Sequence, residues 1–405
     1  MKKIILFVCA LAATFTLSAQ NKMRIWQNGK DHIVKLADAG QMPVDGSSIT
    51  IGGTSYQMSS IDSIIIVPQI SVSYSGTTAV VSIPASVAAD VTATVNGSDV
   101  VITNRNVSNE CEFVLSGTSS NGSFTYNGNY KTTLVLNNLN LTSQKGSPLD
   151  IQCGKRIALE LSEGSSNTLA DAANGSQKAC LYCKGHLEIE GGGSLTVSGN
   201  ARHAIATKEY LQLKKSTGSI TIAKAASDAI HAGQYFQMNG GTLTIDANTK
   251  ADGIQAEAIL LADGKTVDPN EENNGQVLIK GGTIQATIAG EDCKAIKADT
   301  DIAISGGTID ITAQGNGSRG IQTDGNMTIS EADNATNIKI SAKGGLCTLD
   351  ECSEDPHRCM GIKVDGNLTV SGGTTTVLNT GTKSRGIKVG GKYTKTGGTV
   401  NAVIA

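Results

Sequence analysis

The chain has 405 residues, a formal net charge of -3 and no run of basic residues, so its charge gives no reason to expect a nucleic-acid partner. It contains 47 glycines and only 3% aromatic residues, which argues against the usual core of a globular enzyme. Short strands of Ile, Val, Leu, Thr and Ala joined by glycine turns suit this composition better.

Residues 1–19 have the form of a secretory signal peptide. Two lysines precede an apolar run that ends in small residues, as MKKIILFVCALAATFTLSA shows. The run is too short for a membrane span, and its Cys9 follows a poor lipoprotein box, which makes a lipid anchor the lesser alternative. We therefore expect export without a transmembrane segment, to the periplasm, the cell surface or the extracellular space.

Residues 20–69, with the stretches MRIWQNG and SIDSIII, look like a small β-rich leader. A leader in this position would precede the repeats described next. It could cap the open end of the repeat structure, where sheet edges would otherwise be exposed.

Residues 70–405 are predicted to form one repetitive domain. A motif with a central Ile, such as SDAIHAG or ADGIQAE, recurs about every 24–25 residues, and two longer steps indicate inserted surface loops. The anchor residues are Ile205, Ile230, Ile254, Ile296, Ile321, Ile362 and Ile387, and two earlier units fit with Ile151 and Leu181.

Each unit continues with alternating apolar residues and a glycine turn. The first of these apolar ladders, six residues after the anchor, comprises Ile157, Leu187, Leu211, Phe236, Leu260, Ile302, Met327 and Leu368. Alternation indicates strands, and three short strands per unit indicate one coil of a parallel β-helix. The predicted fold is therefore all-β, a right-handed parallel β-helix with a small β-rich N-terminal segment.

Outward-facing ladders would carry the function. Five and seven residues after the anchors stand aromatic, basic and amide side chains, namely Arg156, His186, Tyr210, Gln212, Tyr235 and Gln237. Rings that stack on sugars beside groups that bond hydroxyls are typical of carbohydrate-binding sites. A stack of outward tyrosines is equally compatible with ordinary filling of the strand surface.

A cation site is the second candidate. Asp228 and Asp252 stand two residues before the anchor in adjacent units, and Glu257 belongs to the same unit as Asp252. Converging carboxylates suit calcium, which prefers oxygen ligands. The rival interpretation is a ladder with Lys294 in the next unit, which needs no metal.

Acidic residues also recur three after the anchor in four consecutive units, as Glu257, Asp299, Asp324 and Asp365. Lysines and arginines stand beside them, so a mixed-charge solvated edge is the favoured interpretation. The first insertion, residues 262–275, is acidic and loop-like, and it could border a cation site.

Cysteines suit an exported chain, in which disulfides persist. Cys153 and Cys183 share one ladder position in adjacent units, so a disulfide and simple thiol packing are both compatible with the spacing. Three others, in or beside the second insertion, predict a disulfide that staples that loop. The sequence leaves the pairing open among Cys111, Cys153, Cys180, Cys183, Cys293, Cys347, Cys352 and Cys359.

Residues 131–171 carry a more specific signal. TLVLNNLNLTS and GSPLDIQCGKRIALELSEGSSNTLADAA, followed by the DAIHAG and ADGIQAE units, resemble the bacterial carbohydrate-binding β-helix family of exported clostridial and Bacteroidetes proteins. The resemblance covers about residues 70–405. It implies a fold related to pectate lyases, an acidic plant polysaccharide as ligand and bound calcium, the last only at the two units that contain Asp228 and Asp252.

These observations favour an exported, non-catalytic protein that binds an acidic, pectin-like polysaccharide, with calcium assisting. One alternative is a polysaccharide lyase of the pectate-lyase type, in which a Lys or Arg removes a proton from the sugar. The other is a structural or adhesive β-solenoid. A binder retains polysaccharide unchanged, a lyase generates unsaturated ends, and a rod does neither.

Overall fold

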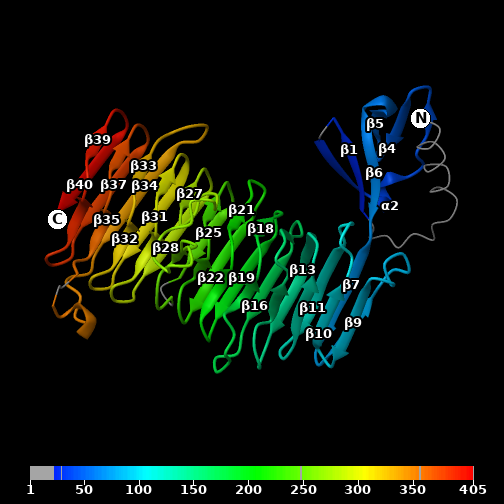
Figure 1. The fold of residues 1–405 in the computed structure, drawn as a ribbon, viewed down its shortest axis with the longest axis horizontal. Helices are drawn as coiled ribbons and strands as arrows, with labels where there is room; N and C mark the ends of the chain where they lie inside the picture. The colour runs from blue at the N-terminus through cyan, green and yellow to red at the C-terminus, as the bar shows by residue number, and fades with distance from the viewer. Residues whose placement is uncertain (1–21, 29, 247–248, 355–356, 405) are drawn as a thin grey trace.

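The computed structural model describes residues 22–404 except 29, 247–248 and 355–356, so the predicted signal peptide, 1–19, lies outside the described residues. The chain forms a long solenoid of strands, with a small β-rich unit at its N-terminal end (Figure 1). Helix is confined to α2 (Leu36–Ala39) and two 3-10 turns, Met58–Ser60 and Asp350–Cys352, in the described part. No helix there is long and apolar enough to cross a membrane.

The N-terminal unit has its own small core. Strands β1 (Lys22–Gln27), β2 (Lys30–Lys35) and β6 (Ile61–Val67) form one antiparallel sheet, and β3 (Val44–Asp45), β4 (Ser48–Ile51) and β5 (Thr54–Gln57) form another. Met23, Ile25 and Ile51 are fully buried between them. Lys22 of β1 pairs with Glu112 and Glu160 of the solenoid, both at 2.9 Å, so ion pairs tie the unit to the first coils.

One side of the solenoid is a twelve-stranded sheet, called here the anchor sheet because it contains the anchor isoleucines. Its strands are β9 (Val91–Asn96), β10 (Asp99–Asn104), β12 (Ser123–Gly128), β14 (Leu149–Gln152), β17 (Ala179–Cys183), β20 (His203–Thr207), β23 (Ile230–Ala232), β26 (Ile254–Ala256), β29 (Lys294–Ala298), β32 (Arg319–Thr323), β35 (Met360–Val364) and β38 (Arg385–Val389). From β10 onward the pairing is parallel.

The remaining strands of each coil pair into a second sheet, which wraps the rest of the coil. They are β7 (Gln69–Ser75), β8 (Thr78–Ser82), β11 (Glu112–Ser119), β13 (Thr132–Thr142), β15 (Ile157–Leu161), β16 (Ser166–Ala170), β18 (Leu187–Glu190), β19 (Ser194–Gly199), β21 (Leu211–Leu213), β22 (Ser219–Ala225), β24 (Phe236–Met238), β25 (Thr242–Ile245), β27 (Val277–Ile279), β28 (Thr283–Ile288), β30 (Ile302–Ile304), β31 (Gly307–Ala313), β33 (Met327–Ile329), β34 (Thr336–Ala342), β36 (Leu368–Val370), β37 (Thr374–Asn379), β39 (Tyr393–Lys395) and β40 (Thr399–Ile404).

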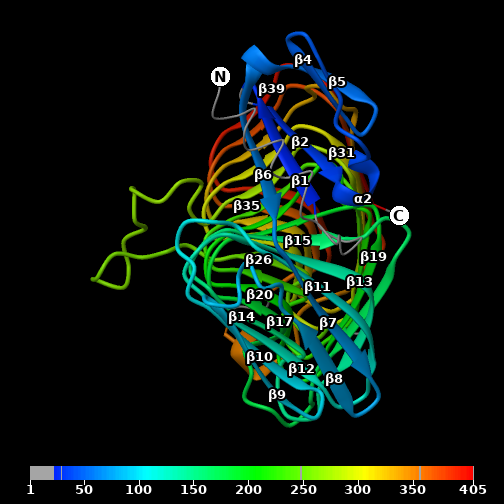
Figure 2. The same ribbon diagram turned by 90° about the vertical axis from the view of Figure 1, so that its right-hand side faces the viewer.

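Figure 2 looks along the solenoid and shows the coils stacked around a common interior. The buried apolar side chains of the coils form one continuous core. Each predicted anchor from Ile205 to Ile387 is paired with the next in register, and nearly all are fully buried. Because a single coil cannot bury its own apolar face, stacking is what creates this core. The predicted parallel β-helix with a small β-rich N-terminal segment is confirmed. The edge strands at its N-terminal end are β8 and β9, which pair antiparallel with β7 and β10.

Two details of the predicted register are wrong. Phe236 pairs with Val277, so Leu260 is not in the apolar ladder but lies in the first insertion, where it is 43% exposed. The loop therefore begins earlier than its acidic residues suggested. In the early coils Leu149, not Ile151, pairs with Leu181, because the stretch from β14 to β15 is longer by two residues than the equivalent stretch in later coils.

That shift separates Cys153 from the ladder position of Cys183. Cys183 pairs with Ile151, and Cys153 lies beyond the end of β14. Both thiols are buried and free, so of the two alternatives the structure has thiol packing.

Candidate functional site

The predicted sugar-contact residues come together on adjacent coils at the start of β15, β18, β21 and β24. The rings of His186 and Tyr210 lie 4.4 Å apart between centroids, and those of Tyr210 and Tyr235 lie 4.8 Å apart and nearly parallel. Because the rings of Tyr210 and Tyr235 stack on each other, the ring faces between them are covered, and Tyr235 is only 9% exposed. A sugar could therefore contact the ring edges here. That this ladder of side chains binds carbohydrate remains a prediction.

Glu188 forms the polar centre of this ladder. The Tyr210 hydroxyl donates to one carboxylate oxygen at 3.0 Å, and the Lys214 ammonium and Arg156 guanidinium reach the other at 3.2 and 3.4 Å. Burial opposes ionisation of Glu188, but these donors and cations outweigh burial and hold the pKa of its carboxyl below the usual range.

The amide side chains continue the same outward surface. Gln212 pairs in register with Glu188 and with Gln237. Gln237 donates to Asn239 and accepts from Lys280, at 3.0 and 3.2 Å. Four of the six predicted ligand residues, Arg156, His186, Tyr210 and Gln237, thus have polar partners within the protein.

Glu188→Gln is expected to lower the free energy of unfolding by about 2 kcal/mol at pH 7, because a buried charged hydrogen-bonding centre is lost. Since folding depresses the pKa of Glu188, its stabilisation is present above the unfolded value of 4.5 and is lost as the pH falls through the folded value. Urea unfolding at pH 7 and pH 3 should show the difference shrinking at the lower pH. The exposed Glu163→Gln is the control, and an equal effect from both variants would contradict this role.

Asp228 lies between two stacked imidazoles on the anchor sheet. Its Oδ2 is 3.2 Å from Nδ1 of His203 and 3.0 Å from Nδ1 of His231, and the ring centroids are 4.5 Å apart. The second ring nitrogen of His231, Nε2, lies 3.1 Å from the Glu257 carboxylate. Although burial opposes both ionised forms, the mutual contacts lower the pKa of Asp228 and raise that of His231 to about 9.

The predicted calcium ligands do not form an oxygen-lined site. Asp252 Oδ1 accepts the Lys294 backbone N–H at 2.7 Å, and burial raises the pKa of Asp252 to about 6. Two groups of potential metal ligands occur among the described residues, namely His203, Asp228 and His231, and Asp292, Cys352 and His357. Neither group contains Asp252 or Glu257. Calcium prefers six to eight oxygen ligands, whereas Asp228 stands with two imidazoles, so this donor set does not fit calcium.

A hollow of about 360 Å³ opens beside the Asp228 cluster, lined by His203, His231 and Glu257. It adjoins a second hollow of about 450 Å³, and the two share Lys178, Tyr182 and Lys208. The hollows form because one outward-facing position of the anchor sheet has a small side chain. There, Ala206 lies between the larger Tyr182 and His231 on the neighbouring coils. The small side chain on this one coil leaves a depression in a surface that larger side chains fill on the neighbouring coils.

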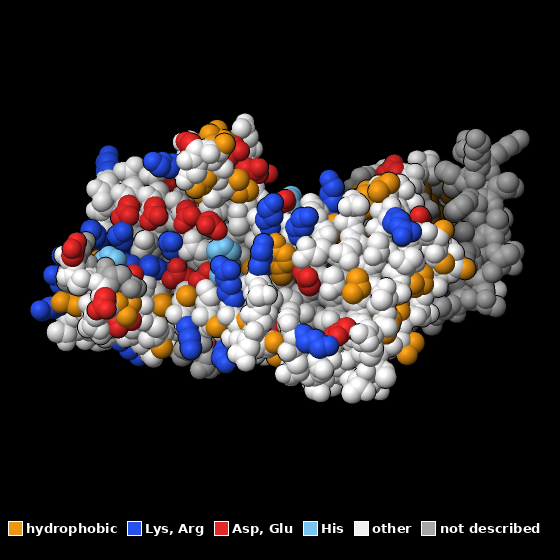
Figure 3. Space-filling view, turned by 60° about the horizontal axis from the view of Figure 1, so that its bottom comes forward, with side chains coloured by type: hydrophobic (Ala, Val, Ile, Leu, Met, Phe, Trp, Pro, Cys, Tyr) orange, Lys and Arg blue, Asp and Glu red, His pale blue; other side chains and the backbone are white. Residues whose placement is uncertain are grey.

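Basic side chains surround the two hollows. Lys178, Lys184, Arg202 and Lys208 are all exposed and line one hollow or both. The space-filling view shows Lys and Arg gathered near the middle of the solenoid, while a row of acidic side chains runs over its C-terminal half (Figure 3). We call these four residues together with Tyr182 the basic groove.

The basic groove was not predicted from the sequence, although a signal for it exists. Three residues after the anchors, the chain has Lys184 and Lys208 in the early units and acidic residues from Glu257 onward. The sign of the charge therefore changes along one ladder. Two of the later acids pair with lysines, Asp299 with Lys297 and Asp365 with Lys363, which agrees with the predicted mixed-charge edge.

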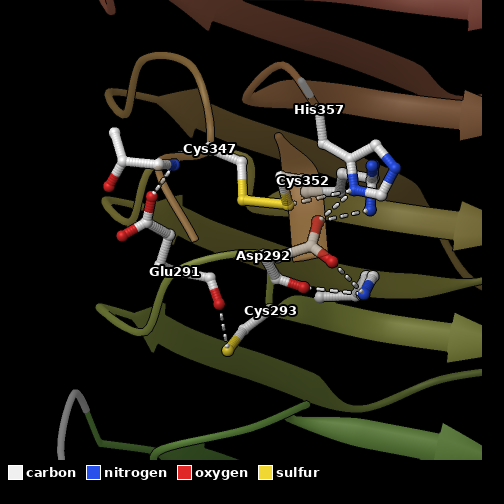
Figure 4. Close-up of a disulfide and its surroundings, with 9 residues drawn as sticks. Glu291, Asp292, Cys293, Cys347, Cys352 and His357 are labelled. Atoms are coloured by element: carbon white, nitrogen blue, oxygen red, sulfur yellow. Dashed lines mark hydrogen bonds and ion pairs between the residues drawn. A yellow bond between two sulfur atoms is a disulfide. The ribbon is translucent and has the colours of Figure 1, made fainter. Parts of the chain in front are cut away.

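The second insertion contains a disulfide between Cys347 and Cys352, which confirms the predicted loop staple (Figure 4). Asp292 lies beside it and contacts His357 Nδ1 at 2.9 Å and Arg319 at 3.1 Å. Asp292, Cys352 and His357 are residue types that bind metal ions, but the Cys352 sulfur is in a disulfide and therefore offers no thiolate. The other cysteines of the described chain are free and buried.

Known proteins similar to this chain agree with a role in carbohydrate binding. A curated carbohydrate-binding domain-containing protein of Acetivibrio thermocellus is 29% identical over 111 residues, which cover 25% of this chain and 39% of the relative. The match thus spans well under half of that relative's length. A solved structure described as a polysaccharide lyase-like protein from C. thermocellum, as a gadolinium derivative, is 23% identical with a TM-score of 0.53.

That likeness covers 65% of this chain and 97% of the solved one, and it concerns the fold. The family model described as carbohydrate-binding domain-containing protein matches residues 96–405, which include the solenoid from β10 and both candidate surfaces. The chain therefore belongs to the family of carbohydrate-binding domain-containing proteins.

Proposed function

We propose that this protein is exported and binds an acidic polysaccharide in the basic groove without cleaving it. The observation that carries the proposal is the group of four exposed basic side chains around Tyr182, in two adjoining hollows on one sheet face. Family membership supports a carbohydrate as the ligand. The charge of the groove favours one that bears carboxylates.

The cations of the groove are available to a ligand. Within the described part of the chain, none of the four lies within ion-pair distance of a carboxylate, whereas Lys363 farther along the same face pairs with Asp365 at 2.9 Å. The Lys178 ammonium lies over the Tyr182 ring, 5.0 Å from its centroid, and donates to its hydroxyl at 3.3 Å. An anionic ligand would therefore meet cations that form no ion pair, while the carboxylates of Asp150 and Glu257 also line the hollows.

The periodicity of the solenoid suits a periodic polymer. Neighbouring coils are about 4.8 Å apart, so Lys184 and Lys208 on successive coils present charges at a regular spacing. A uronate chain carries its carboxylates at regular intervals, and several weak contacts of this kind add to useful affinity. Gln152 and Ser176 line the same hollow and can bond sugar hydroxyls. Calcium has no part in this proposal, because its predicted ligand set does not form.

The test is affinity electrophoresis through polygalacturonate gels. The double variant Lys184→Ala/Lys208→Ala should bind about tenfold more weakly, since two exposed charge contacts together contribute about 1.4 kcal/mol. The matched control is Lys215→Ala/Lys224→Ala, which removes two exposed lysines from outside the groove. Retardation of the wild type should also weaken with added salt.

Three outcomes would overturn the proposal. Equal losses in both double variants would mean that net charge, not the groove, determines binding. Absence of retardation across acidic polysaccharides would remove the ligand class. New ultraviolet absorbance from unsaturated sugar ends would show a lyase in place of a binder.

A further inference from the structure

We propose that His203, Asp228 and His231 form a binding site for a transition-metal ion of the zinc type. The ligand atoms would be the Nδ1 atoms of the two imidazoles and Oδ2 of the carboxylate. These atoms come from two successive coils of the anchor sheet, His203 from the coil of β20 and Asp228 and His231 from the coil of β23, and lie within 4.8 Å of one another. The proposal concerns the protein alone and does not depend on which glycan the basic groove binds.

The distances match those between ligands of one ion. Asp228 Oδ2 lies 3.2 Å from His203 Nδ1 and 3.0 Å from His231 Nδ1. Zinc bonds to nitrogen and oxygen of about 2.0–2.1 Å at a tetrahedral angle place neighbouring ligand atoms about 3.3 Å apart. All three ligand atoms lie within 4.8 Å of one another, so the two stacked imidazoles would tilt toward a shared ion to bind it.

His203 supplies an independent sign of a ligand. Its side chain is buried, with the residue only 5% exposed, yet its Nδ1 has no hydrogen-bond partner in the described structure. The nitrogen is close to the Asp228 carboxylate but is not aligned with it for a hydrogen bond. A buried polar atom without a bond is costly, and an ion along the free lone pair would satisfy it.

The surroundings orient the other two ligands, and an ion would displace the proton between His231 Nδ1 and Asp228 Oδ2. Glu257 lies 3.1 Å from His231 Nε2, where it can hold the proton on that nitrogen and leave Nδ1 for a metal. Asp228 Oδ1 accepts the Asp252 backbone N–H at 3.1 Å, which orients the carboxylate and directs Oδ2 between the imidazoles. Carboxylate–histidine–metal arrangements use this kind of support.

The donor set selects the kind of ion. Two imidazoles and one carboxylate suit zinc, cobalt and similar ions, whereas calcium requires many oxygen ligands. His203 and His231 both line the 360 Å³ hollow, so an ion can enter from solvent and keep a fourth position open to it. The structure thus disagrees with the calcium that the family resemblance implies for Asp228.

Titration of the metal-free full chain tests this site. In a His357→Gln background, which removes the separate group near Asp292, Co²⁺ should bind one equivalent and give the strong visible absorption of a tetrahedral site. Zn²⁺ should displace it, and a large excess of Ca²⁺ should not. His203→Gln and His231→Gln should each weaken binding about 100-fold, as loss of one of three ligands predicts.

Two further variants keep the result interpretable. His32→Gln, in the N-terminal unit, is the matched histidine control and should bind normally. Glu257→Gln changes a side chain that is 57% exposed, so it should preserve the fold, and should weaken Co²⁺ binding about 10-fold by loss of orientation. The site would be refuted by absent Co²⁺ absorption in the folded protein, by unchanged binding in Glu257→Gln and the histidine variants, or by displacement with Ca²⁺.

Discussion

Phe236→Ala is expected to lower the free energy of unfolding by about 4 kcal/mol, the largest effect predicted here for a single substitution. Phe236 is fully buried in β24, and its ladder neighbours on the adjoining coils are Leu211 and Val277. Truncation removes apolar contacts and leaves a cavity that the ladder cannot close, because each coil is held in place by the hydrogen bonds of both neighbours. Urea unfolding followed by circular dichroism measures the loss.

Tyr393 is the matched control for Phe236. It occupies the same ladder position in the last coil of the described structure, but it is 48% exposed. Tyr393→Ala should therefore cost less than about 1 kcal/mol, since it removes an aromatic ring without opening an internal cavity. Similar losses from the two variants would show that Phe236 is not in a tightly packed interior.

The repeat and the core were predictable from the sequence because stacking constrains every coil in the same way. An anchor such as Ile230 pairs in register with Ile205 on one neighbouring coil and Ile254 on the other, so the same spacing recurs in coil after coil of the sequence. The predicted register was wrong where a single coil departs from the repeat and no other coil shows the same departure. Leu260 has the right spacing, but nothing in the sequence shows that the insertion begins before it and that Val277 replaces it in the ladder.

The candidate site was less predictable, for physical reasons that particular residues show. Tyr210 and Tyr235 were correctly placed on an outward ladder, but the sequence does not reveal that their rings stack on one another. The hollow beside His231 depends on the small size of Ala206 between two larger neighbours, which is a contrast between coils rather than a motif.

The chemistry of Asp228 depended on a similar contrast. Its spacing with Asp252 suggested paired carboxylates, since both residues stand two before an anchor. In the structure each carboxylate accepts a backbone N–H from the next coil, and the free oxygen of Asp228 meets His203 and His231 instead. Backbone hydrogen bonds between coils used the oxygen atoms that a calcium site would have required.

Gly344→Ala is expected to lower the free energy of unfolding by about 3 kcal/mol, because a methyl group has no space at this corner. The coils meet there through a ladder of glycines, namely Gly290, Gly315, Gly344 and Gly381. A Cβ on Gly344 would overlap the carbonyl oxygen of Gly315, and a Cβ on Gly315 would overlap that of Gly290 in the same way. The obstacle is rigid backbone, whose displacement would disturb the hydrogen bonds of neighbouring coils.

The size of this effect follows from the spacing of the solenoid. Strands in neighbouring coils are held about 4.8 Å apart, and a side chain directed along the axis cannot be accommodated without breaking that spacing. Gly154→Ala is the control, since nothing lies within 4 Å of the position of its Cβ, and it should change stability by less than about 0.5 kcal/mol. Thermal and urea unfolding of both variants decide the matter: if Gly344→Ala is as stable as Gly154→Ala, the coils do not meet through glycine backbone at this corner.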